Sequence, residues 1–421
     1  MAATVTDLIQ LHEGFKEEGI FQKIATTQLL QFGTASKQML GARILPERSV
    51  ALNNFEEDQV RWRTFPALDS TRYSPAQLQD DGLLVGSYQV RLGYQNTASQ
   101  LTAARLDNLL LAIENNQTGA TSADSRLIDF FTNLVNRVMV KNEIQRWEAM
   151  LLRNVKRTGT GGYQDIANYP IEDDSYWVAN VDKNGGGDGS GTASDPKGWF
   201  AKDESYDPIA EDFLRAKDLL EDKGYRINNI YMDRVLANVF QRNPVIQRLA
   251  NARWTVTADG DVGSVSQRAS RAMLNGLMND NELPGITVYN LGYQLPTSYA
   301  RYIKPLGTPA NRHFVLITAE TDQDTELYIE EKDESIILDN TMGYFAVGTC
   351  SGEPAPGRRS FSRVGEQHPV NVYGEVIQAS LPVIQHPQAL ITIAVDKPAE
   401  EGEDLDQIKS VPALYRDFAV A

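Results

Sequence analysis

The sequence predicts an α+β protein, and three stretches carry that prediction. Residues 121–155 contain neither proline nor glycine, which is typical of one long helix. Residues 207–330 alternate amphipathic helical segments with short runs of branched apolar residues, and residues 370–396 are strongly β-like. Mixed strands with covering helices are typical of an α+β protein.

Length and composition limit the classes of protein that fit. A chain of 421 residues is longer than one core usually encloses, so two domains are expected. The formal charge of −16 disfavours tight binding to nucleic acid or to an anionic membrane. The single cysteine, Cys350, excludes an intramolecular disulfide, and neither a signal peptide nor an apolar run of membrane-spanning length is visible. We therefore expect synthesis and folding in a cytoplasm.

The first hundred residues predict an arm and a hairpin. Residues 4–32 hold scattered apolar residues interrupted by Gly14 and Gly19, as expected of an arm that lies on another surface. Residues 45–65 and 83–95 read as two strands joined by an irregular tip. An isolated hairpin is marginal in water, so we expect it to pack on a neighbouring molecule. A hairpin folded onto its own domain remains the alternative.

A short helix at 101–114 precedes the long helix predicted from Thr121 to about Val155. Thr121 and Asp124 form an approximate capping box, and Lys156 and Arg157 precede a glycine-rich break that would end the helix. The apolar stripe slips near its middle, so its two halves need different partners. The predicted core of this helix is Phe131, Leu134, Val138, Ile144, Trp147 and Leu151.

The rest of the chain predicts a second, compact α+β region. The glycine-rich run 183–198 is a loop rather than a phosphate cradle, because it lacks Gly-Lys-Ser/Thr at a helix start. The two last strands are expected to return beneath the long helix. The predicted helices are 207–224, 233–240 and 267–278, and the predicted strands are 227–232, 286–291, 313–318, 326–330, 370–383 and 389–396.

No pattern of catalytic or metal-binding residues is apparent. The four histidines are scattered, and Cys350 has no base near it in sequence. The acidic residues at 330–334 are expected in a solvated turn, and residues 258–264 lack the later glutamate of a calcium loop. We therefore predict a protein that is not an enzyme and that holds no cofactor and no metal.

The order of these elements resembles the major capsid protein of tailed bacteriophages with the HK97-type fold. Three stretches carry the resemblance: RWEAMLLRN at the end of the long helix, the unit AEDFLRAKDLLEDKGYRINNIYMDRVLANVF, and GEVIQASLPVIQHPQALITIAV, read as a terminal hairpin. The resemblance implies an HK97-like fold divided into an N-terminal arm (1–48), an E-loop with flanking strands (49–100), a P domain with the spine helix (101–160), an A domain (161–365), return strands of the P domain (366–400) and a C-terminal segment (401–421).

The resemblance also implies a function in assembly. Hexamers and pentamers of the chain would build an icosahedral virion head around double-stranded DNA, bound without sequence specificity. Expected partners are other copies of the chain, a portal and a separate scaffolding protein, with or without a decoration protein, and no membrane. The predicted intersubunit contacts of the E-loop are Arg61, Trp62, Arg63, Phe65 and Tyr73.

Two features depart from parts of that family. Some members crosslink an E-loop lysine to a neighbour, but no lysine lies between Lys37 and Lys141, so we expect a shell without this bond. The sequence begins at the arm, so a scaffold is expected to be separate or already removed. A related bacterial nanocompartment (encapsulin-like) shell and, from another class, a cytoplasmic α+β hydrolase are the alternative functions.

Overall fold

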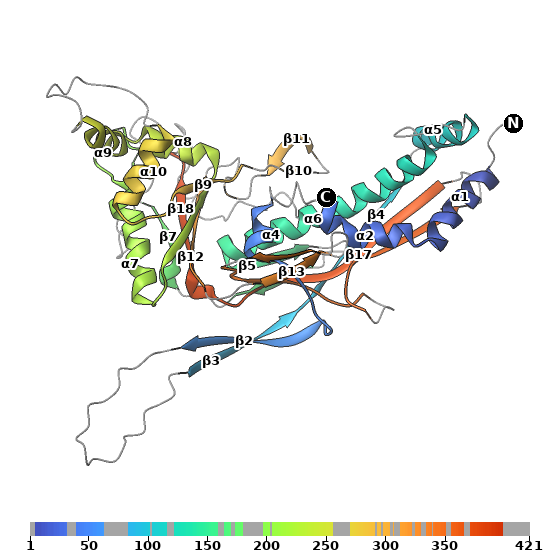
Figure 1. Cartoon of the computed structure of the whole chain (residues 1–421), viewed down its shortest axis with the longest axis horizontal. Coiled ribbons are helices and arrows are strands. Elements are labelled where there is room, and N and C mark those ends of the chain that lie inside the picture. The colour runs from blue at the N-terminus through green and yellow to red at the C-terminus, as the bar shows by residue number, and fades with distance from the viewer. Residues whose placement is uncertain are drawn as a thin grey trace, which may run out of the picture. The chain divides into compact units, whose positions relative to one another are not determined.

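The computed structural model divides into two compact units, and the chain passes between them five times. Unit 1 is Met1–Thr26, Glu47–Val138 and Gly343–His386, and unit 2 is Thr27–Pro46, Met139–Met342 and Pro387–Ala421. The α+β class is confirmed, with both units mixing helices and strands (Figure 1). The structure describes residues 5–31, 39–62, 83–101, 103–115, 122–158, 164–169, 173–179, 197–202, 204–255, 270–290, 293–295, 298–303, 306, 312–321, 325–329, 334–338, 340–350, 355–365 and 371–398.

The sheet of unit 1 is organised around the 14-residue strand β17 (Asn371–Ile384). One side of β17 pairs first with β16 (Arg359–Gly365) and then with β15 (Gly343–Val347), both antiparallel. The other side pairs with β4 (Gly93–Gln100), and the short β1 (Glu47–Ser49) adds to β15 in parallel. Because β15 and β16 belong to this sheet, the predicted limit of the A domain at residue 365 does not match the division between the units.

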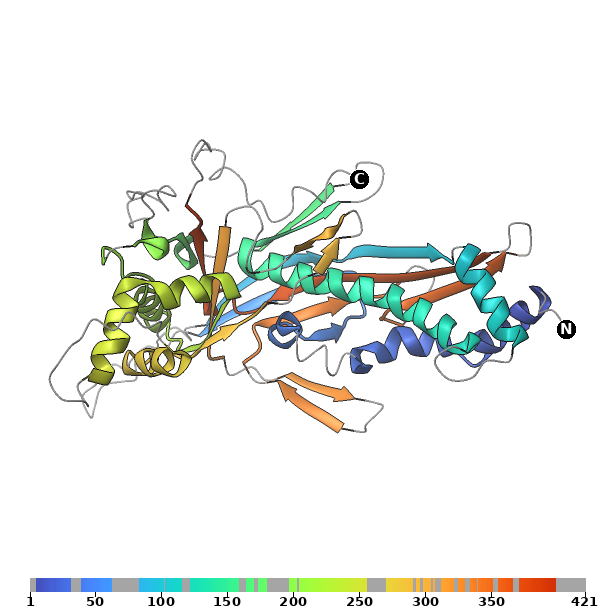
Figure 2. The same ribbon diagram turned by 90° about the horizontal axis from the view of Figure 1, so that it is seen from above.

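Helices cover this sheet within unit 1. They are α1 (Val5–Glu17), the first part of α2 (Ile20–Gln31), α5 (Ala103–Glu114) and the first half of α6 (Ala123–Leu152), which runs over β17 (Figure 2). Gly374 of β17 allows the close approach, because a Cβ there would lie 2.7 Å from the Phe130 ring. The ring centroids of Phe21 and Phe131 are 4.2 Å apart, so the predicted arm lies against the long helix of its own chain.

Unit 2 is built on a five-stranded sheet in the order β7-β18-β12-β8-β9. Every residue of β18 is buried, which places this apolar strand between two partners. The prediction that residues 389–396 return to the first domain and form a hairpin with 370–383 is therefore wrong, because β18 belongs to unit 2 and pairs with β12 and β7. The expected contact with the long helix is present within unit 2, where the Thr392 hydroxyl donates to the Met150 carbonyl of α6 at 3.3 Å. The strands are β7 (Tyr176–Val178), β8 (Ile227–Met232), β9 (Ile286–Val288), β12 (Arg312–Ala319) and β18 (Leu390–Asp396).

Local signals explain where the helices of unit 2 begin and end. Asp233 caps α8 through the Leu236 amide at 2.8 Å, and Ser270 caps α10 through the Met273 amide at 3.2 Å. Gly224, at φ +81°, follows the end of α7 as predicted. The helix α9 (Pro244–Thr255) was not expected from the sequence. The other helices are α4 (Leu40–Ile44), the π-helix η4 (Ile209–Leu214), α7 (Arg215–Asp222), α8 (Arg234–Arg242) and α10 (Arg271–Asp280).

The shorter elements complete the described chain. Pairs of strands form between β5 and β6, between β10 and β11 and between β13 and β14. Their bounds are Asn154–Thr158, Gln164–Asn168, Tyr293–Leu295, Ser298–Ile303, Thr325–Ile329 and Glu334–Leu338, and the 3₁₀ turns are Asp173–Ser175, Gly198–Phe200 and Pro387–Ala389.

The long helix is confirmed, although both of its predicted ends need correction. The 30 residues of α6 make a rod about 45 Å long. The Ser122 hydroxyl accepts the Ser125 amide at 3.2 Å, and the predicted cap Thr121 lies outside the described residues. At the other end Arg153 adopts φ 61° and stops the helix, so Lys156 and Arg157 lie in β5. The Arg153 guanidinium holds this turn by donating to the Ser175 carbonyl at 2.7 Å, and burial lowers its pKa to about 10.

Candidate functional site

The predicted hairpin is an antiparallel ribbon of β2 (Asn54–Trp62) and β3 (Leu83–Arg91). Its register runs from Asn54 opposite Arg91 to Trp62 opposite Leu83, and Figure 1 shows the two strands side by side. Among the described strands, β2 and β3 pair only with each other. In the distal half of the ribbon the register places two pairs of apolar residues directly opposite each other. These are Val60, Trp62, Leu83 and Val85.

The base of the ribbon is anchored to unit 1 by hydrogen bonds around Glu57. The Tyr344 hydroxyl donates to one Glu57 oxygen at 2.6 Å, and the Gln385 amide donates to the other at 2.7 Å. The Tyr88 hydroxyl donates to the Ile384 carbonyl at 3.1 Å. Burial and the nearby Glu57 carboxylate raise the pKa of the Tyr88 and Tyr344 phenols, so both remain donors at neutral pH. The ribbon is thus fixed at its base, and these bonds do not extend to its distal half.

The predicted contact residues fall at the distal end of this ribbon or beyond it. Arg61 and Trp62 are the last two residues of β2 and lie opposite Leu84 and Leu83. Arg63, Phe65 and Tyr73 lie outside the described residues.

The six residues predicted as the core of the long helix are all buried. Phe131, Leu134 and Val138 belong to unit 1, and Ile144, Trp147 and Leu151 belong to unit 2. Beyond the slip in the apolar stripe, every residue from Asn142 to Leu151 is buried. A helix covered on all sides must pair its polar side chains internally.

Glu143 is the centre of the polar contacts within unit 2. Its Oε1 atom accepts from the Gly41 amide at 2.8 Å, from the Trp147 indole at 2.9 Å and from the Tyr289 hydroxyl at 3.1 Å. The Arg146 guanidinium lies 3.5 Å from the other oxygen. One buried carboxylate thus ties α4 and the loop after β9 to the second half of α6.

Arg146 extends this network, which sequence reasoning missed. Its Nε atom donates to the Leu45 carbonyl at 2.9 Å, and the whole residue is buried. Gly41 is required beside Glu143, because a Cβ there would lie 2.8 Å from both carboxylate oxygens. One feature of the sequence could have indicated this network. Glu143 and Arg146 lie three residues apart in a helix that has apolar residues on more than one face, which is typical of a buried charged pair.

A second buried carboxylate, Asp212 of η4, has three donors of its own. The Trp177 indole donates to Oδ1 at 2.9 Å, and the Trp199 indole and Tyr206 hydroxyl donate to Oδ2 at 2.6 and 2.7 Å. Burial raises the pKa of Asp212, and the three donors and Arg215 oppose that effect. With both oxygens engaged and the residue buried, this arrangement packs helices onto the sheet and offers no open base.

The described histidine and cysteine side chains that could act as a base, ligand or nucleophile are also engaged in hydrogen bonds. His313 lies 3.1 Å from the α8 cap Asp233, and His12 lies 2.9 Å from the Ser362 hydroxyl. The buried Cys350 thiol donates to backbone carbonyls. Across the described ranges, no group of three or more histidine, cysteine, aspartate or glutamate side chains is placed to hold a metal. Within the same ranges, no helix is long and apolar enough to cross a membrane.

Comparisons with known proteins give structural likenesses at low sequence identity. No protein-family model and no curated protein matches the sequence. A phage-related protein from Bordetella bronchiseptica RB50 is 15% identical, with 85% of this chain and 92% of that chain covered and a TM-score of 0.46. The capsid of Myoviridae phage XM1 is 11% identical, with 85% and 90% covered and a TM-score of 0.40. The holo-SrpI encapsulin complex from Synechococcus elongatus PCC 7942 is 11% identical, with 85% and 88% covered and a TM-score of 0.39.

Proposed function

We propose that this chain is a shell-forming subunit, the major capsid protein of a tailed phage, and that its function is to associate with other copies of itself. The β2–β3 ribbon carries the proposal. A two-stranded ribbon is marginally stable in water without a third strand or a covering layer. Here the described hydrogen bonds to the rest of unit 1 lie at the base, while farther out Val60 lies opposite Val85 and Trp62 opposite Leu83. These apolar pairs gain most by lying on another molecule.

A second copy of the chain is the partner that this arrangement favours. A projecting element that rests on the next copy forms a head-to-tail contact, and such contacts close into rings when the rotation between copies permits. Hexamers and pentamers are the rings from which an icosahedral shell is built. The long helix α6, buried on all sides over its second half, supplies the rigid element that repeated contacts require.

The remaining partners follow from the same proposal. A head of this kind would enclose double-stranded DNA, and a net charge of −16 would limit adhesion between the protein and the packaged DNA. A portal, a separate scaffolding protein and a decoration protein would join the shell, which would form in the host cytoplasm and end in the virion. The predicted contacts Arg61, Trp62, Arg63, Phe65 and Tyr73 would lie at the ribbon's end of the interface.

The test is the size and content of the particles formed by the full chain. Purified protein or lysate is examined by size-exclusion chromatography and negative-stain electron microscopy, and the contents are digested with nuclease or protease after opening. Closed particles of megadalton mass that contain DNA, or that form empty without protein cargo, are expected. Particles filled with an enzyme would favour a nanocompartment shell instead. A small oligomer under all assembly conditions would refute both shell functions.

A further inference from the structure

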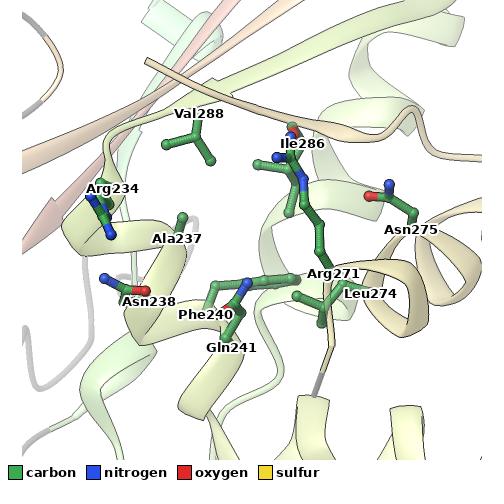
Figure 3. Close-up of a pocket in the computed structure, with 10 residues that line it drawn as sticks. All are labelled: Arg234, Ala237, Asn238, Phe240, Gln241, Arg271, Leu274, Asn275, Ile286 and Val288. Carbon is green, nitrogen blue, oxygen red and sulfur yellow. The ribbon is translucent and has the colours of Figure 1, made fainter. Parts of the chain in front are cut away.

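Unit 2 carries a groove that none of the contacts above explains. It has a volume of about 230 Å³ and lies between α8, α10 and β9. Its apolar lining includes Phe240, Leu274, Ile286 and Val288, and Val288 is 37% exposed. Arg234 and Arg271 lie on opposite sides of the groove, with Val288 and Phe240 between them and Ile286 beside Arg271 (Figure 3). An apolar floor between two cations fits an extended segment that offers an apolar side chain flanked by carboxylates.

The lining of the groove is basic in a chain that is otherwise acidic. Arg234 and Arg271 are the charged residues among those that line it, and none of the lining residues is acidic. The whole chain carries −16. This local reversal of sign favours an acidic occupant over a neutral one.

The chain itself supplies a matching segment. The described residues end at Pro398, and residues 400–406 read EEGEDLD, with five acids, no base and one large apolar residue, Leu405. Leu405 has an acid on each side, Asp404 and Asp406. The composition of this segment therefore matches both the charged ends and the apolar floor of the groove.

The topology of the sheet starts this segment at the same end of the sheet as Arg234. On β12, Arg312 pairs with Asp396 of β18, and Val315 pairs with Met232 of β8, so β8 and β18 end at the same edge. Arg234 follows β8 almost directly. The strands β18 and β8 are separated by β12 alone, a distance of about 10 Å. Residues 399–406 can extend about 26 Å, which is ample for the crossing.

The point of departure is also fixed. Asp396 receives two hydrogen bonds from the Arg312 guanidinium, at 2.5 Å to Oδ1 and 2.9 Å to Oδ2. A short tether to a fixed point gives the segment a high effective concentration at a groove within reach. Binding within one chain therefore needs less intrinsic affinity than binding of a free peptide.

We propose that residues 400–406 of the same chain occupy this groove, with Leu405 on the apolar floor and its flanking carboxylates paired with Arg234 and Arg271. The segment covers Val288 and offsets the positive charge of the α8–α10 face. This inference does not depend on shell formation, because both groove and segment belong to one copy.

The test is hydrogen–deuterium exchange, read by mass spectrometry, over peptides that cover residues 399–410 of the full chain. In the unaltered protein, we expect these amides to exchange at least about 10-fold more slowly than in the variant Arg234→Glu/Arg271→Glu. The matched control, Lys202→Glu/Arg242→Glu, makes the same charge change at exposed residues outside the groove and should keep the protection. Peptides from β12 and β18 report whether each variant remains folded.

The segment can be altered without touching the fold, which guards against a misfolded groove variant. Glu403→Lys/Asp404→Lys/Asp406→Lys should lose protection alone and regain it when combined with Arg234→Glu/Arg271→Glu. Equal exchange in the unaltered protein and in both charge-reversed proteins would overturn the proposal. Protection that falls with dilution of the protein would also overturn it, because the occupant would then come from a second copy.

Discussion

The β2–β3 ribbon and the second half of α6 differ in how much of their surface the same chain stabilises. From Asn142 to Leu151 the helix is buried on every side, and its charged residues Glu143 and Arg146 find partners within unit 2. The ribbon is bonded to unit 1 at Glu57 and Tyr88, near its base. The first region is completed by its own chain, whereas the proposed function has the distal half of the second completed by another copy. Changes in the two regions should therefore separate folding from association.

The largest effect on folding is expected from Glu143→Ala. The change removes the acceptor of Gly41, Trp147 and Tyr289 and leaves Arg146 without its carboxylate. We expect a loss of about 3–5 kcal/mol in the free energy of unfolding, measured by urea titration with tryptophan fluorescence. Glu143→Gln keeps the volume and one acceptor and should cost less. Equal stability of the Ala variant would show that the network does not hold unit 2 together.

A smaller effect is expected from Gly41→Ala. The added Cβ would lie 2.8 Å from both carboxylate oxygens of Glu143, so α4 or the carboxylate must shift. We expect a loss of about 1–3 kcal/mol in the same titration. Gly14→Ala is the matched control, because nothing lies within 4 Å of its Cβ and alanine favours the helix α1. A Gly41 variant as stable as the Gly14 variant would contradict the close approach.

At the base of the ribbon, Tyr344→Phe should have a modest effect. It removes the hydroxyl that donates to Glu57 at 2.6 Å and leaves the ring in place. We expect a loss of about 1–2 kcal/mol, since one bond to a charged group is lost while the Gln385 bond remains. Hydrogen exchange over β2 should rise with it. Unchanged exchange there would mean that the base is held by other contacts.

The smallest effect on folding, and the sharpest on association, is expected from Val60→Asp/Val85→Asp. These residues face each other in the distal half of the ribbon. We expect the free energy of unfolding of the single chain to change by less than about 0.5 kcal/mol, as for surface substitutions. Particle formation, followed by negative-stain microscopy, should be lost. The matched control Gln59→Asp, at the neighbouring position of β2, should still assemble. Normal particles from the double variant would show that the distal half of the ribbon is not needed for association.

Patterns that are local in sequence predicted much of this molecule. The absence of proline and glycine predicted α6, and alternation with a turn-rich tip predicted β2 and β3. The sequence could not assign β18 to a sheet, because an apolar run indicates burial but not the identity of its neighbours. The Glu143 network was missed for the same reason: Gly41 and Tyr289 lie 102 and 146 positions away along the chain. Contacts at that separation are determined by the whole fold rather than by any one stretch.

The position of β18 has a consequence for biosynthesis. It lies between β7 and β12, yet it is the last strand of the described chain. While the ribosome is still adding residues 343–386 to unit 1, the position of β18 in the sheet of unit 2 is empty. The edges of β7 and β12 that will pair with β18 are then unpaired. These edges of β7 and β12 must not pair with any other strand until residue 396 has left the exit tunnel. Premature termination just before Leu390 should therefore yield a product that aggregates rather than one that is truncated but usable.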